Sequence, residues 1–133
     1  MAIRVVRLGQ PKARGEGTRL GTVRRPPRGV RKTRYAAESY YDVWLPNLAP
    51  SARLMKLTKR AGGVDDAGRW RRFAARYRSE MNTPQNLAVI QTLAALSHRT
   101  SFSVGCYCED ERRCHRSVLR EILNEHGAKL STR

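Results

Sequence analysis

The stretch FSVGCYCEDERRCHRSVLREIL, residues 102–123, decides the fold class of this chain. Its first seven residues alternate in the manner of a strand, with one face made of Phe102, Val104, Cys106 and Cys108. The charged run at 109–113 predicts a turn, and a helix is expected from about Cys114 to His126, ended by Gly127. A strand, a turn and a helix in this order predict an α/β unit, in which ligands bind where the strand gives way to the helix.

The other segments predict two more strands, at about 2–8 and 19–24, and four more helices. The first helix is expected to end at about Leu45, before Pro46, and the second to run from a Ser51 cap through Leu57. A third follows a cap at Asp65 or Asp66 and carries the apolar stripe Trp70, Phe73, Tyr77 and Met81. The fourth starts at Thr83-Pro84 and reaches about Ser97.

These elements predict one small α/β domain over residues 1–133, with a short, mostly parallel sheet flanked by helices. Its N-terminal third, about residues 1–34, is expected to be basic and loop-rich, because it holds eleven Lys and Arg residues against one acid, Glu16. The turn RRPPRGV, residues 24–30, is expected to be rigid and to present arginines.

The net charge of +16 predicts a polyanionic partner, either nucleic acid or a nucleotide. A general enrichment in arginine is the alternative explanation. Arginines near the N-terminus argue against a secretory signal, and the longest nearly apolar run, LAVIQTLAAL, is about half of what a bilayer requires. We therefore expect a cytoplasmic protein without a membrane partner, while its oligomeric state stays open.

All three cysteines lie within nine residues, at 106, 108 and 114. At a helix N-terminus, unpaired N–H groups and the helix dipole would stabilise a Cys114 thiolate, as a nucleophile, a redox-sensitive thiol or a metal ligand. A small buried cysteine is the alternative. Adjacent helical residues point about 100° apart, so Cys114 and His115 form a direct pair only if the helix starts one residue later.

Two further observations bear on what this turn binds. Arg116 would present paired donors to an anion at the helix N-terminus, with Arg113 nearby. Structural zinc has four possible ligands in the three cysteines and His115. Two cysteines spaced C-x-C on an extended strand, however, lie about 6.5–7 Å apart, too far for zinc unless the strand curls. We therefore predict no metal site and no cofactor.

The segment CYCEDERRCHRSVLREIL resembles the Cys-His-Arg signature of the domain-of-unknown-function 488 family, the YeaO-like proteins. VWLPNLAPS, FAARYRSEM and VRRPPRGV resemble three further segments of that family, in the same order. Residue by residue, Cys106, Cys114, His115 and Arg116 match the C-terminal signature, and Arg24, Pro27, Arg28 and Gly29 match the upstream turn. Val23 and Pro26 stand where the family usually has Asp and Trp. The resemblance implies a small α/β fold in which the two arginine-bearing turns lie close together.

These observations favour a protein that binds a phosphate-bearing ligand at the Cys-His-Arg turn. Its expected ligand-binding residues are Arg116, Arg24, Arg28 and Arg113. The alternative is a thiol-dependent enzyme with Cys114 as nucleophile and with His115 and Cys106 as further candidate catalytic residues. A zinc-stapled binding module is a third possibility.

Overall fold

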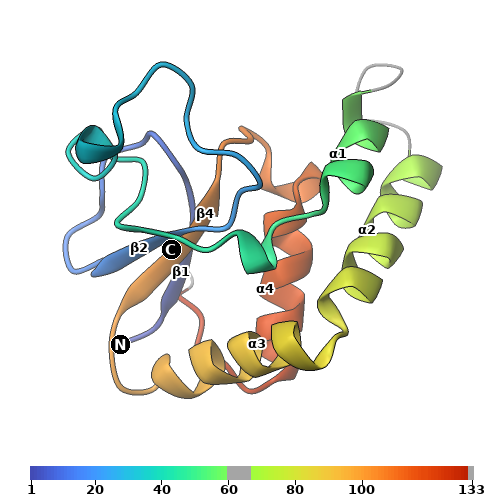
Figure 1. The fold of residues 1–133 in the computed structure, drawn as a ribbon. Coiled ribbons are helices and arrows are strands. Elements are labelled where there is room, and N and C mark those ends of the chain that lie inside the picture. Colours follow the sequence, from blue (N-terminus) through green and yellow to red (C-terminus); the bar gives the residue numbers. More distant parts are fainter. Residues whose placement is uncertain (60–66, 132–133) are drawn as a thin grey trace.

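A computed structural model describes residues 1–59 and 67–131 of the chain (Figure 1). Its strands within these residues are β1 (Ile3–Arg7), β2 (Thr18–Gly21), β3 (Val43–Trp44) and β4 (Phe102–Cys106). Its α-helices there are α1 (Ala52–Lys59), α2 (Ala67–Met81), α3 (Pro84–Leu96) and α4 (His115–Glu125). Short 3-10 turns lie at Lys32–Arg34, Pro46–Leu48 and Glu111–Arg113.

The strands form one sheet in the order β1-β4-β2-β3, and every pairing is parallel. Val104 of β4 lies between Val5 of β1 and Leu20 of β2. Strand β4 is buried over its whole length, which fits its near-continuous apolar sequence. The predicted α/β class is confirmed, and the described sheet is entirely parallel.

The main core lies between the sheet and α4. Phe102 and Val104 of β4 pack in one cluster with Leu119 and Leu123 of α4, and these side chains are almost fully buried. Figure 1 shows α4 beside the sheet, with α2 and α3 packed against α4, while the loops after β1 and β2 run on the other side of the strands. Burying each large apolar side chain contributes roughly 1.5–3 kcal/mol, so this layer holds α4 firmly at the end of β4.

The face of the sheet that points toward the loops carries a buried ion pair. Nε of Arg19 lies 2.8 Å from a carboxylate oxygen of Glu16, and each side chain is 1% exposed. Ser103 donates its hydroxyl to Glu16, and Arg19 also donates to the carbonyls of Gln10 and Ser39. Burial raises the pKa of Glu16, but hydrogen bonds from Arg19, Ser103 and the Ala13 N–H outweigh it and lower that pKa to about 2. This network ties the long loop between β1 and β2 to the sheet.

Three helix boundaries predicted from the sequence are confirmed. The Thr83 hydroxyl accepts the Asn86 N–H at the start of α3, and the Ser51 hydroxyl accepts the Leu54 N–H before α1. Gly127 follows α4 with a positive φ of 82°. The caps predicted at Asp65 and Asp66 lie outside the described residues.

The helix predicted to end at Leu45 is wrong. Residues 35–40 form turns, with Ser39 at φ 64°, and Val43–Trp44 form an edge strand paired with β2. The ring of Tyr41 lies against Gly21, where a Cβ would come within 2.3 Å of that ring. Tertiary packing of Tyr41 on β2 therefore overrides the helical spacing of the apolar residues.

Candidate thiol site

The three cysteines meet at the carboxyl end of the sheet, where β4 ends and α4 begins. Cys106 is the last residue of β4, and Cys114 is the N-cap of α4, its sulfur accepting the Arg116 N–H at 3.5 Å. The Sγ atoms of Cys106 and Cys114 are 2.7 Å apart, and both residues are 2% exposed. Two buried thiols are thus in direct contact at a position where α/β proteins bind ligands.

Cys108 completes the cluster because the chain leaves the strand after Cys106. Its N–H donates to the Cys106 sulfur at 3.4 Å, so the backbone turns back on itself instead of continuing as a strand. The predicted placement of Cys108 on the strand is therefore wrong. Of these three described cysteines only Cys108 is exposed.

The pKa values of the three cysteines are shifted in different directions. Hydrogen bonds from Cys106 and Cys114 lower the pKa of Cys108, and the nearby charge of Arg116 acts in the same direction. The hydrogen bond with Cys108 raises the pKa of Cys106. For Cys114, the contact with Cys106 lowers the pKa, but the contact with Cys108 and burial outweigh it. These shifts favour ionisation of the exposed Cys108 thiol over that of the two buried thiols.

His115 is buried, and its ring lies between the Thr22 carbonyl and the Cys114 sulfur. Its Nε2 lies 2.7 Å from the Thr22 carbonyl, so this nitrogen carries the proton, and Nδ1 faces the Cys114 sulfur at 3.7 Å. Burial lowers the pKa of His115 to about 4, so the ring is neutral at pH 7. Because α4 starts at His115 and Cys114 lies outside the helix, the two side chains face each other.

Arg116 is the buried cation of the site, with 3% of its surface exposed. Its Nη2 donates to the Cys108 carbonyl at 2.6 Å, which fixes the turn that carries the exposed thiol. Within the described residues its Nε has no hydrogen-bond partner, although the guanidinium interacts with the Cys114 sulfur. The side chain therefore both holds the turn and keeps positive charge beside the sulfurs.

The other arginines predicted as ligand contacts are placed differently. Arg24 donates to the carbonyls of Pro46, Ala49 and Pro50, so it braces the segment before α1. The Arg113 guanidinium lies 6.0 Å from the ring centroid of Trp70, and Arg28 is exposed. Among the described residues, no hydrogen bond joins any of these three to Arg116.

The sequence of this chain also matches a known family. The family model described as "DUF488-N3a: Active DUF488-N3 subclade" matches residues 3–127. The chain belongs to the DUF488 family. No significant match was found among curated proteins or among solved structures.

Sequence reasoning missed several residues of the site in this DUF488 protein. The Thr22 carbonyl, which sets the His115 tautomer, belongs to an unremarkable stretch after β2. Tyr41 packs with Val23, Cys106 and Cys114, and its buried hydroxyl has no hydrogen-bond partner within the described residues. Val23 therefore forms part of the apolar wall beside the thiols, at the position where the resemblance indicates an Asp in relatives.

The cluster also contains a possible set of metal ligands. The ligand atoms of Cys106, Cys114 and His115 all lie within 4.8 Å of one another. Cys108 is not part of this group, so three of the four ligands considered from the sequence lie together among the described residues.

Within the described residues, no helix combines the length and the apolar character needed to cross a bilayer.

Proposed function

We propose that this DUF488 protein is a thiol-dependent enzyme in which the Cys108 thiolate is the nucleophile. The observation that carries the proposal is an exposed thiol with a lowered pKa, Cys108, in the turn beside two buried thiols that contact each other. Sequence reasoning favoured Cys114 for this role. A 2% exposed sulfur with a raised pKa suits a hydrogen-bond donor better than an attacking group.

Each neighbour then has a defined role. Cys106 and Cys114 lower the pKa of Cys108, and neutral His115 positions Cys114 by accepting its S–H at Nδ1. Arg116 holds the turn through the Cys108 carbonyl and adds positive charge. The sulfur of Cys108 would form a bond to an electrophilic atom of the substrate while that atom's bond to its leaving group breaks, the leaving group taking the electron pair and a proton from water. Hydrolysis of the covalent intermediate would then return the Cys108 thiol. The description of the matching subclade as active supports catalysis.

The test is residue-resolved alkylation with iodoacetamide between pH 5 and 10, read by mass spectrometry. The wild-type chain is expected to react at Cys108 with a midpoint well below the ordinary thiol value of about 8.5. Cys114→Ser is expected to raise that midpoint, and Cys108→Ser to abolish fast labelling. Fast labelling that persists in Cys108→Ser, or a wild-type midpoint of about 8.5 or higher, would contradict the proposal.

A second candidate function is binding of a phosphate-bearing ligand, nucleic acid or nucleotide, at the helix start. The net charge of +16 and the unpartnered Nε of buried Arg116 favour it. Contacts of this kind read phosphate, so affinity for duplex or single-stranded nucleic acid should fall linearly on a log–log plot against salt. Equal affinity at low and high salt would rule this function out.

A third candidate, a zinc-stapled module, is favoured by the convergence of Cys106, Cys114 and His115. It requires one zinc per chain and loss of folding on chelation. Protein that is free of zinc and equally stable with a chelator would exclude it and leave the thiols free for catalysis.

A further inference from the structure

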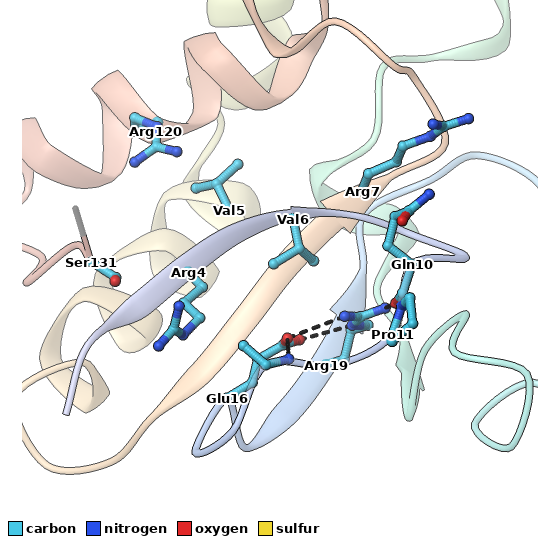
Figure 2. A pocket seen from close by; sticks show the side chains of 11 residues that line it. Arg4, Val5, Val6, Arg7, Gln10, Pro11, Glu16, Arg19, Arg120 and Ser131 are labelled. Atoms are coloured by element: carbon cyan, nitrogen blue, oxygen red, sulfur yellow. Dashed lines mark hydrogen bonds and ion pairs between the residues drawn. The ribbon is translucent and has the colours of Figure 1, made fainter. Parts of the chain in front are cut away.

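A second candidate binding site lies along the outer edge of β1, in a pocket of about 230 Å³. Figure 2 shows that the pocket wraps around this edge strand, with Val5 pointing toward Arg120 of α4 and with Arg4 and Val6 on the side of Glu16 and Arg19. The pocket is smaller than the roughly 300–1,000 Å³ of sites for drug-sized molecules. It therefore suits one charged group and a small attached body.

The charges that line the pocket favour an anion. Arginines at 4, 7, 19 and 120 face a single acid, Glu16. Arg19 and Glu16 form an ion pair at 2.8 Å, so these two side chains are held in place along one side of the pocket. Arg4 is half-buried and has no partner within the described residues, which leaves its guanidinium available to the pocket.

The backbone of β1 adds donors at the same edge. The N–H and C=O of Ile3 point outward, where they bond the Lys129 carbonyl and the Ser131 N–H. Because successive residues of a parallel strand alternate in the direction of these groups, the Val5 N–H points to the same edge. A described strand covers β1 only on its β4 side. An N–H beside an arginine is a combination that binds phosphate oxygens.

The pocket reaches the turn that carries Cys108. Nε of Arg7 donates to the Tyr107 carbonyl at 3.3 Å, and its Nη2 lies 3.5 Å from Glu109. Glu109 is 83% exposed in its side chain, so this ion pair is weak and gives way readily to a ligand. Arg120, on the other side, is held by Glu111 of the same turn.

We propose that this pocket binds the phosphate group of a small phosphorylated ligand. The proposal stands on the pocket alone, because Cys108 does not line it and because Arg4 and the β1 edge belong to a different part of the sheet from the thiols.

The test measures binding of inorganic phosphate, pyrophosphate and a nucleoside monophosphate by calorimetry at low ionic strength, with amide shifts followed by NMR. The full chain should bind at least one of these probes and shift the Val5 and Val6 amides. Arg4→Gln should weaken that binding about tenfold, the loss expected for one charge-assisted hydrogen bond. Arg4→Lys should retain part of the affinity.

Two controls make the outcomes decisive. Arg99→Gln removes the same charge from an exposed residue that does not line the pocket and should bind like the wild-type chain. Cys108→Ser should also bind normally, so a failure of the thiol function leaves the pocket testable. Equal affinity of Arg4→Gln and Arg99→Gln, no binding of any probe, or shifts centred on Cys114–Arg116 would overturn the proposal.

Discussion

At the scale of single residues, the site depends on where the chain turns after Cys106. In this turn the Cys108 N–H donates to the Cys106 sulfur, and the Arg116 side chain holds the turn through the Cys108 carbonyl. A buried guanidinium beside a sulfur favours the thiolate form. The reactivity of Cys108 is therefore a property of its neighbours.

Substitution of Arg116 tests this dependence. Arg116→Gln removes the positive charge, so the pKa of Cys108 should rise by about one unit or more. Arg116→Lys keeps the charge and should lie between Arg116→Gln and the wild-type chain. The pH dependence of Cys108 alkylation measures the effect, and an unchanged midpoint in Arg116→Gln would show that the guanidinium does not act on the thiol.

Protonation of His115 should destabilise the fold. The folded pKa is about 4, while an unfolded histidine titrates near 6.5, so stability is complete above pH 6.5 and is lost as the pH falls through this window. At pH 5 the loss is about 2 kcal/mol. Urea unfolding of metal-free protein at pH 7.5 and 5 measures it.

His115→Gln should lose this pH dependence, while His126→Gln, an exposed histidine, should retain it. The same loss between pH 7.5 and 5 in the His115→Gln variant would assign the effect to other groups.

At the scale of elements, the helix caps are the features best predicted from sequence. Thr83→Ala removes the acceptor of the Asn86 N–H and should cost about 1 kcal/mol of unfolding free energy. Thr83→Ser keeps the hydroxyl and should be close to the wild-type chain. Thermal or urea unfolding measures both, and an alanine variant as stable as the serine variant would mean that the cap contributes nothing.

The elements that sequence reasoning misplaced depend on contacts between distant segments. Apolar spacing around Tyr41 favours a helix, but Tyr41 packs against Gly21 and draws Val43–Trp44 into the sheet. Alternation also cannot tell where β4 ends, so Cys108 was expected on the strand. A helix cap is local and readable, whereas both of these outcomes are set by tertiary packing.

In the candidate site, too, the features set by local sequence could be predicted and those set by tertiary contacts could not. The placement of Cys114 at the start of a helix follows from the local pattern and agrees with the structure. The hydrogen bonds of Arg24 to carbonyls within residues 46–50 join segments that are distant in sequence, so no local pattern predicts them. For the same reason the arginines that line the β1 pocket were not singled out as a group.

At the scale of the whole molecule, one face of this basic chain is held together by Glu16, the one buried acid among the described residues. The folded pKa of Glu16 is about 2 against an ordinary value of 4.5, so its contribution is complete above pH 4.5 and is lost as the pH falls toward 2. That contribution is about 3 kcal/mol. Acid unfolding should therefore be steep between pH 4.5 and 2.

Glu16→Gln tests this directly because it leaves Arg19 buried without a counter-charge. The expected cost is about 3–5 kcal/mol at pH 7, measured by urea unfolding. Glu38→Gln changes an exposed acid in the same part of the chain and should cost almost nothing. Similar stability of the two variants would contradict the role given to Glu16.

The central claim is that the exposed thiol of the cluster carries the negative charge. Carbon-13 NMR of protein labelled at the cysteine Cβ atoms, titrated from pH 4 to 11 without metal, reads the ionisation of each thiol directly. Cys108 should titrate well below about 8.5, the ordinary thiol value, and Cys106 and Cys114 should titrate above it. A Cys108 signal that titrates at or above 8.5, or a Cys114 signal that titrates first, would contradict it.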